Sequence, residues 1–395
     1  MCYAIASIYF YSMGMFIAPI EKELGWSRAQ ISSAFVILSV VGVFANPLMG
    51  RVLDRYGSRR VALFGMSVHC AAFSAMSLVE SLWMWWFLWG LAAVGGAAVS
   101  AMVWVAATVS RFDKARGLAL AITLCGAGIG ASAAPLLASG FIADYGWRGA
   151  YARLGAGMAA VALPLILLLF YDASDLRRRS GEPVHAPAQR ALVGGSSYLE
   201  ALWSMQFIKL ALSTLLLSVP MFAISANLIP ILASLGIDNV VAASAAAAFG
   251  MGSLAGRAGT GLLLDRVNPT ILGAVIFALP IAGLVLLMSG AAIAPAVIIG
   301  AATLGLALGG EIDIVAYLTS RYMAETEFAS LFGIIVTMQI LALGIGPFAV
   351  NYGFDLTGSY SSFLVAALPC FALASMMILS LGKPRITVGQ PAEAA

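Results

Sequence analysis

Three ionisable residues lie inside long apolar stretches of the sequence: Arg257, Glu311 and Asp313. A charged side chain at the centre of a membrane helix costs about 2.5–3.5 kcal/mol on insertion scales, so such residues usually face a cavity and serve a function. The guanidinium of arginine is permanently charged and planar, and it matches the geometry of a carboxylate. A neighbouring acid can carry a proton. These residue types predict a site that binds an organic anion and couples it to protons; a structural salt bridge is the alternative.

The positions of Arg257 and Asp313 predict that the two residues lie at one depth. Arg257 precedes Asp265 by eight residues, and Asp313 precedes Arg321 by eight, where Asp265 and Arg321 close their apolar stretches at the same face. A helix rises 1.5 Å per residue, so both side chains start about 12 Å inward. We therefore expect an arginine and a carboxylate at one level, near the midplane of a membrane.

Glu311 and Asp313 are both candidates for the proton carrier. Two residues apart on a helix, they point about 200° away from each other, so only one can fully face a cavity. Asp313 shares its face with Tyr317, and Glu311 lies nearer the midplane. The sequence does not choose between them. Tyr317 and three other polar or aromatic residues in apolar stretches are candidates for lining the same cavity: Tyr9, Asn227 and Gln339. The alternative for these three is that they only pack against other helices.

The elements that carry these residues are predicted to be membrane helices. The chain of 395 residues is 62% hydrophobic and 10% charged, whereas soluble domains are about 45–50% apolar and about 25% charged. Backbone polar groups in lipid must be satisfied within their own segment, and one helical span needs about 20 apolar residues. By that measure we expect twelve spans: 1–20, 31–49, 61–79, 82–108, 117–141, 150–170, 206–233, 240–263, 271–289, 292–320, 329–350 and 360–381.

A polar segment divides these spans into two groups of six. Residues 171–197 are rich in Pro, Gly and Ser, which predicts a linker. The chain then consists of an N-terminal half, 1–170, the linker, a C-terminal half, 198–383, and a tail, 384–395.

The second half repeats landmarks of the first half. GRVLDR at residues 50–55 reappears as GLLLDR at residues 261–266, and Gly25 matches Gly236 at the same shift of 211 residues. Parallel repeats of this kind are found in transporters whose halves are related by an axis along the membrane normal. The predicted fold class is therefore an all-α membrane protein with twelve transmembrane helices in two pseudo-symmetric six-helix halves.

The distribution of Lys and Arg orients the chain. Fifteen of these residues lie in one set of alternate loops and in the tail, whereas Lys22, Arg28 and Arg148 lie in the opposite loops. Positive residues are enriched on the cytoplasmic side of membranes. We therefore expect the linker and both termini in the cytoplasm.

The charged run GRVLDRYGSRR at residues 50–60 joins the second and third spans. It resembles the signature loop of the major facilitator superfamily, G-x-L-x-D-R-x-G-R-R/K, with Val52 in place of the leucine. In that family the loop latches the two halves together on the cytoplasmic side when the cavity faces outward. Basic residues that only follow the positive-inside rule would not explain Asp54. The resemblance implies a gating role for Gly50, Asp54, Arg55 and Arg59, and for the second copy, Asp265 and Arg266.

The sequence FGMGSLAGRAGTG around Arg257 is similar to the eighth-span motif of the monocarboxylate transporters, F-x-D-x-x-x-R, whose arginine takes the substrate carboxylate. Ser253 stands where that family has its aspartate, and the first span lacks the lysine of animal members. The stretches GWSRAQIS, RGLALAI and GWRGAY are common in bacterial relatives, including the oxalate–formate antiporter group. The resemblance implies an anion site at Arg257, while the missing aspartate leaves proton coupling to Glu311 or Asp313.

Together these patterns predict a secondary transporter and not an enzyme. It would move a small organic anion, a monocarboxylate, with protons across the bacterial inner membrane by alternating access, as a monomer in the bilayer. The chain has no phosphate-binding G-x-x-x-x-G-K-S/T motif for ATP, no metal or cofactor motif, and a net charge of +3 that is too small to predict nucleic-acid binding. An exporter of hydrophobic or cationic compounds is the alternative, and a membrane sensor that binds without transporting is another.

Overall fold

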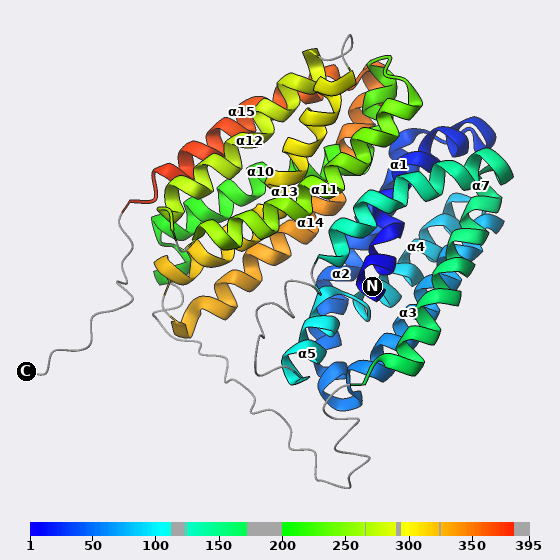
Figure 1. Cartoon of the computed structure of the whole chain (residues 1–395), viewed down its shortest axis with the longest axis horizontal. Helices are drawn as coiled ribbons and strands as arrows, with labels where there is room; N and C mark the ends of the chain where they lie inside the picture. The colour runs from blue at the N-terminus through cyan, green and yellow to red at the C-terminus, as the bar shows by residue number, and fades with distance from the viewer. Residues whose placement is uncertain are drawn as a thin grey trace, which may run out of the picture.

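The computed structural model describes residues 1–111, 123, 125–171, 200–264, 266–289, 294–323 and 325–382. Every regular element within these residues is a helix (Figure 1). The first half contains α1 (Cys2–Leu24), α2 (Arg28–Tyr56), α3 (Ser58–Ala75), the short η1 (Met76–Leu78), α4 (Leu82–Ala97), α5 (Ala101–Arg111) and α7 (Gly126–Leu169). The second half contains α10 (Met205–Ser234), α11 (Asn239–Leu264), α12 (Pro269–Ser289), α13 (Ala294–Tyr322), α14 (Glu325–Thr357) and α15 (Ser361–Leu379).

Ten of these helices are long and apolar enough to cross a membrane. One of them, α7, has 44 residues and reverses direction at Gly146, whose backbone is non-helical (φ 69°, ψ 172°), so α7 makes two crossings (Figure 1). The consecutive helices α4 and α5, separated by residues 98–100, form one further crossing. The described helices thus agree with twelve spans, although the first part of the span predicted at 117–141 lies outside the described residues. The predicted fold class is confirmed.

Apolar side chains are found both inside and outside this helical bundle. Each half has its own buried core, which includes Phe73 in the first half and Phe277 in the second. On the outside, Phe44, Trp83 and Leu169 expose 69%, 78% and 74% of their surface. Such exposed apolar surface is unfavourable in water and suits a lipid environment.

The repeat that the sequence indicates is present in the backbone. Gly25 and Gly236 both follow the first helix of their half with a left-handed conformation, φ 67° and φ 77°, which side chains with a Cβ rarely adopt. A second pair of glycines with positive φ, Gly146 and Gly358, lies between the last two spans of each half, at φ 69° and φ 72°. The two halves therefore place glycines with positive φ at matching turns.

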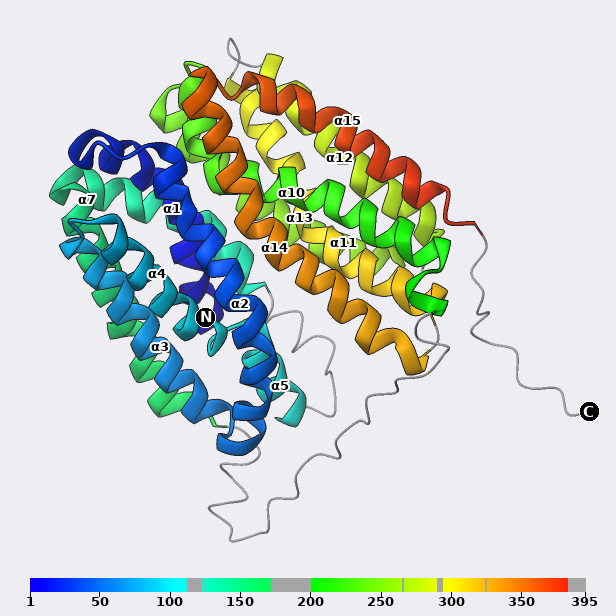
Figure 2. The same cartoon turned by 180° about the vertical axis from the view of Figure 1, so that it is seen from behind.

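Among the described helices, the main contacts between the two halves are those of α1 with α10, α2 with α14, and α7 with α11. We call the end of the bundle that contains the turn from α1 to α2 the Gly25 end. The opposite end, which contains the turn from α2 to α3, is the Gly57 end. Figures 1 and 2 show the two halves side by side, separating toward the Gly57 end. The halves are therefore held together at the middle and at the Gly25 end.

Close backbone contacts join the halves at mid-depth. A Cβ atom on Gly14 of α1 would lie 2.7 Å from the carbonyl oxygen of Ala226 in α10. Pro230, four residues after Ala226, has no N–H for that carbonyl, and Asn227 is distorted from the helix (φ −115°, ψ 17°). Only a residue without a side chain fits at this crossing, so α1 and α10 touch directly.

At the Gly25 end, the first turn of α2 is held by the other half. The carboxylate of Asp355 accepts hydrogen bonds from the backbone N–H of Arg28 (3.1 Å) and of Ala29 (2.8 Å). The Arg28 guanidinium donates to the Tyr360 hydroxyl (3.1 Å) and lies 3.9 Å from the centre of the Phe354 ring. The N–H groups of a first helical turn lack partners in their own helix and carry partial positive charge, so an anion there is stabilising.

A buried amide extends this contact inward. Asn351 of α14 donates to Ser32 of α2 (2.6 Å) and to Asn227 of α10 (2.7 Å), and accepts from Tyr360 (2.8 Å). Asn351 and Asn227 are both fully buried. The residues Arg28, Ser32, Asn227, Asn351, Asp355 and Tyr360 together form what we call the Gly25-end lock.

The lock leads to a prediction about Asp355. Replacing Asp355 by alanine removes the acceptor for two N–H groups of α2, an effect of about 1 kcal/mol for a helix cap. We expect a roughly fivefold change in the ratio of closed to open conformations at this end. Leu78 and Val240 are both exposed at the Gly25 end, and each can be replaced by a spin-labelled cysteine. The distance between the two labels, measured by double electron–electron resonance, should be longer in Asp355→Ala than in the parent protein.

The matched control is Asp144→Ala, because Asp144 has the corresponding place in the first half and is exposed. Its distance distribution should equal that of the parent protein. An unchanged distribution in Asp355→Ala would show that the lock does not hold the two halves together.

Candidate functional site

Arg257 and Asp313 face each other between α11 and α13. The Nη1 atom of Arg257 lies 3.9 Å from Oδ1 of Asp313, which confirms the prediction that they share one level. Their side chains keep 25% and 30% of their surface exposed. The pair is thus loose and open on one side, unlike a buried bidentate ion pair.

Glycines bring these two charges together. A Cβ atom on any of four glycines would lie 1.9–2.1 Å from a backbone carbonyl of the facing helix, so α11 and α13 pack backbone against backbone. The four are Gly252 and Gly256 in α11, and Gly305 and Gly309 in α13. The carbonyl of Ser253, the residue at the family's aspartate position, faces Gly309 in this contact. The distance between the two helix backbones that carry Arg257 and Asp313 is therefore fixed.

The opposite wall of the site belongs to the first half. Tyr3 and Tyr11 of α1 lie near α11, the helix that carries Arg257. A Cβ atom on Gly126 of α7 would lie 3.3 Å from Tyr3, and Gly128, two residues on, packs against Leu254, one turn before Arg257. Tyr11 lines a small cavity together with Phe249 of α11. A ligand that lies between Arg257 and α1 would therefore contact both halves, as a substrate must when it is passed between two open states.

A cavity of about 250 Å³ adjoins these tyrosines. Tyr3, Tyr9 and Tyr11 line it from α1, Asn46 from α2 and Phe222 from α10. The α1 residues that line it all precede Gly14, so the cavity lies on the Gly57 side of the contact between Gly14 and Ala226. We call it the central cavity.

Glu311 lies in a different environment from Asp313. Its side chain is 1% exposed, and its Oε1 atom accepts hydrogen bonds from Ser218 of α10 and from Gln339 of α14 (2.9 Å). This arrangement joins α10, α13 and α14 within the second half. The predicted divergence of the two acids is therefore present: Asp313 meets Arg257, and Glu311 is enclosed by hydrogen-bonding partners.

The other predicted lining residues are not gathered at Arg257. Tyr9 lines the central cavity, and its ring packs edge-on against His69 with centroids 4.6 Å apart. Gln339 is bound to Glu311. Tyr317 accepts hydrogen bonds from Arg321, one turn further on, at 2.8 Å and 3.2 Å. The structure thus places Tyr9 beside the site, and Tyr317 and Gln339 in local contacts of the second half.

Asn227 belongs to the lock, and two other residues of the lock, Asn351 and Asp355, are not among those predicted from the sequence. Asn351 stands in an apolar stretch, AVNYGF, so the signal that selects Asn227, a polar side chain among apolar ones, applies to it as well. Asp355 gives no such signal. Its contact with the N-terminus of α2 spans 326 and 327 residues of sequence, and no local pattern reveals such a contact.

The predicted latch residues are described only in part. Gly50 is described only as part of the backbone of α2, and the side chain of Asp54 and the whole of Asp265 lie outside the described residues. Arg55 and Arg266 are exposed. Arg59 donates to the carbonyl of Leu167 and lies 4.1 Å from the centre of the Tyr171 ring, both in its own half. The latch therefore stays a prediction.

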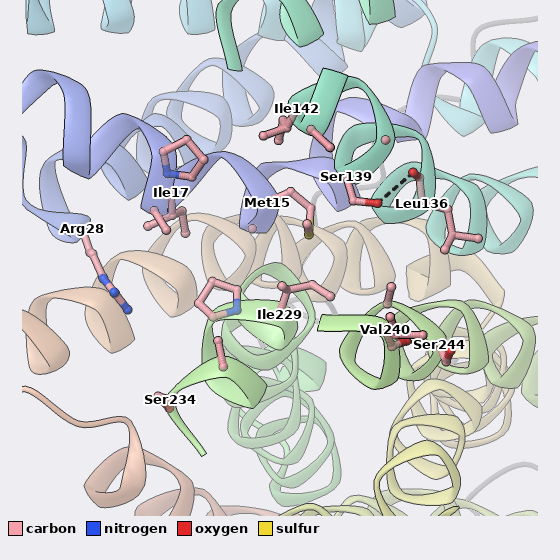
Figure 3. A pocket seen from close by; sticks show the side chains of 18 of the residues that line it. Met15, Ile17, Arg28, Leu136, Ser139, Ile142, Ile229, Ser234, Val240 and Ser244 are labelled. Atoms are coloured by element: carbon pink, nitrogen blue, oxygen red, sulfur yellow. Dashed lines mark hydrogen bonds between the residues drawn. The ribbon is translucent and has the colours of Figure 1, made fainter. Parts of the chain in front are cut away.

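A second, larger pocket of about 1030 Å³ opens at the Gly25 end. Figure 3 shows Met15 of α1 and Ile229 of α10 on opposite sides of it, with Arg28 at its edge. The lining is mostly apolar, with Ser139 and Ser244 among its few polar side chains. Gly14 lines this pocket too, so the crossing of α1 and α10 separates it from the central cavity.

Comparisons with known proteins give one family. The sequence model of the Major Facilitator Superfamily matches residues 1–347. The chain is 26% identical to the 3-(3-hydroxy-phenyl)propionate transporter of Escherichia coli (strain K12), over 90% of this chain and 85% of that protein. It is 24% identical to monocarboxylate transporter 13 of Bos taurus, over 93% of this chain and 84% of that protein.

Two further comparisons agree with this family. A match at 30% identity joins 30% of this chain to 28% of the oxalate:formate antiporter of Oxalobacter formigenes. Among solved structures, the nucleoside transporter NupG has the same fold, with a TM-score of 0.72 over 96% of each chain at 11% identity. The resemblance predicted from the sequence motifs is confirmed.

Proposed function

The chain belongs to the Major Facilitator Superfamily, and from this membership we propose that it is a secondary transporter of a small organic anion, a monocarboxylate, that works by alternating access. The pairing of Arg257 with Asp313 is the observation that carries the proposal. The guanidinium is partly exposed beside the interface of the halves, and its resident partner at 3.9 Å makes a loose contact. A substrate carboxylate can form the tighter, two-point contact that this fork favours.

The named relatives support an organic anion as substrate. They include transporters for 3-(3-hydroxy-phenyl)propionate and for monocarboxylates, and an antiporter for oxalate and formate. All of these substrates carry a carboxylate, which is the group that Arg257 is suited to bind.

We assign the coupling role to Asp313 and not to Glu311. A nearby cation favours the charged form of a carboxylate. When a substrate anion binds to Arg257, it screens that cation from Asp313, so binding of the anion favours binding of a proton. Glu311 has no such link, because its partners are the neutral side chains of Ser218 and Gln339. Symport of one anion with one proton follows from this competition.

The orientation completes the proposal. The Gly57 end carries the excess of Lys and Arg, so it is assigned to the cytoplasm, in the inner membrane of a bacterial cell. The lock then holds α2 against α14 at the outer face, beside the large pocket that opens there, and the crossing of Gly14 with Ala226 separates that pocket from the central cavity. The halves separate toward the inside. Opening of the outer face would require Asp355 and Asn351 to leave α2.

Efflux of hydrophobic cations is a second candidate, because aromatic rings line the central cavity and attract cations. Efflux of cations would not depend on Arg257, because the positive charge of Arg257 would oppose the binding of a cation.

Arg257 provides the test of the anion site. In proteoliposomes, Arg257→Ala should lower saturable uptake of labelled monocarboxylates by about tenfold to a hundredfold, since it removes a charge-assisted contact. Arg257→Lys should restore little of it, because an ammonium lacks the planar fork. Arg153→Ala, an exposed arginine of the first half, is the control. Normal anion uptake by Arg257→Ala would disprove the proposal, and uptake of cations alone would favour efflux.

Variants of Asp313 and Glu311 test which of the two acids couples transport to protons. Asp313→Asn should keep exchange of anion for anion but lose accumulation driven by an imposed pH gradient. Glu311→Gln retains an acceptor for Ser218 and Gln339, and we expect it to accumulate substrate normally. Both are measured as labelled uptake with protein-free liposomes as background. If Asp313→Asn still accumulates substrate against its gradient, the competition for Arg257 does not couple the proton.

Cysteine labelling tests the orientation. Single cysteines introduced into the linker between residues 177 and 197 should react with an impermeant maleimide only from the cytoplasm. A cysteine at Asp238, which is exposed at the opposite end, should react only from outside. Labelling of the linker from outside would reverse the assignment of both faces.

A further inference from the structure

We propose that the carboxylate carried by this transporter bears a ring-sized apolar body, as in a 3-arylpropanoate, with the carboxylate at Arg257 and the ring in the central cavity. This inference rests on the proposed function and adds the identity of the body of the substrate. It is carried by the size, the lining and the position of the cavity.

The size of the central cavity suits a ring. A cavity of about 150 Å³ in an apolar core accommodates benzene, and the central cavity has about 250 Å³. The additional space fits a short chain between ring and carboxylate. An acid of one to three carbons would leave most of the apolar wall without contact, which forfeits dispersion and burial.

The lining offers aromatic contacts from both halves. Phe10 of α1 lies edge-on to Tyr11 and to Phe222 of α10, with ring centroids 5.0 Å and 6.5 Å apart and interplanar angles of 88° and 89°. All three residues line the cavity. A substrate ring can enter such an edge-to-face arrangement, which aromatic pairs prefer.

The wall on the other side is rigid. The Tyr9 ring is held between His69, at 4.6 Å, and Trp89, at 5.9 Å between centroids. The Nδ1 atom of His69 lies 2.9 Å from the carbonyl of Ala92, and the histidine is fully buried. Because these neighbours fix Tyr9, the wall is shaped before a ligand arrives, which reduces the ordering cost of binding.

Two tyrosines connect the cavity with the charge. Tyr3 and Tyr11 line the cavity and also lie beside α11. A Cβ atom on Gly126 would lie 3.3 Å from Tyr3, its neighbour Gly128 packs against Leu254, one turn before Arg257, and Tyr11 lines a small cavity with Phe249. A ligand that fills the cavity can therefore extend along α1 toward the guanidinium, so one molecule can satisfy both features.

The experiment compares acids that differ only in the ring. Isothermal titration of the purified full-length protein at neutral pH measures binding of propanoate, 3-phenylpropanoate and the uncharged 3-phenylpropanamide. We expect 3-phenylpropanoate to bind about tenfold or more tightly than propanoate, because the ring becomes buried. The amide should bind at least tenfold more weakly than the acid, because it lacks the charge for Arg257.

Two substitutions place the ring in the cavity. Gly96 lines the cavity, and a Cβ there would lie 3.6 Å from His69 and 3.8 Å from the Tyr9 hydroxyl, an ordinary contact distance. Gly96→Val should weaken 3-phenylpropanoate tenfold and leave propanoate unchanged. Phe222→Leu, a second variant should Gly96→Val not fold, should weaken the aryl acid alone. Gly157→Val is the control, since a Cβ on the exposed Gly157 meets nothing within 4 Å.

The outcomes separate this inference from the proposed function. Equal binding of the two acids, or equal weakening of both by Gly96→Val, overturns the ring-sized body and leaves an anion transporter. If neither these acids nor lactate, formate and oxalate bind, the organic-anion function itself fails. If the amide binds as well as the acid, the ring site exists but Arg257 does not take the carboxylate, and the inference is wrong.

Discussion

A permanent positive charge inside an apolar bundle is the constraint on which the rest of this structure depends. A guanidinium carries a permanent charge, and lipid cannot solvate it. Asp313, 3.9 Å from Arg257, balances the charge without enclosing it. An anion from solution can therefore still compete for the guanidinium. The cost of burying the arginine is therefore offset in a way that leaves a binding site.

The two ends of the bundle are closed to different extents. The Gly25 end is held by neutral amides and hydroxyls, by the Arg28 guanidinium and by the Asp355 carboxylate at a helix terminus. Contacts of this type are individually worth about 1 kcal/mol, so they can be broken together by a modest difference in ligand affinity. At mid-depth, Gly14 and Ala226 touch through the backbone and separate the central cavity from the pocket above it. Closure is thus firm near the ligand and weak near the surface.

The sequence predicts the charged site better than it predicts the lock, for a physical reason. Arg257 and Asp313 are conspicuous because apolar helices seldom carry charge, and the constant rise of a helix converts their positions into depths. The twelve spans can be predicted from the lengths of the apolar stretches, and the repeat can be predicted from the recurrence of short motifs. Asn351 and Asp355 contact residues more than 100 positions away, and no local pattern shows which residues pair across such distances. Tyr317 and Gln339 were selected for residue type alone, and their partners, Arg321 and Glu311, depend on rotamers and neighbours that a sequence does not contain.

The glycine contacts between α11 and α13 have a consequence for how this protein can diversify. Because carbonyls occupy the space where side chains would be, almost any mutation at Gly252, Gly256, Gly305 or Gly309 would push the two helices apart. The helix spacing that sets the distance between the charges therefore tolerates few mutations. Variants that remain folded keep the same electrostatics at this site. The side chains of Tyr3 and Tyr11 on α1 are not held by backbone contacts of this kind, because they line the central cavity. Selection for a new cargo would therefore act on the first half, while the second half preserves the charge that every cargo must satisfy.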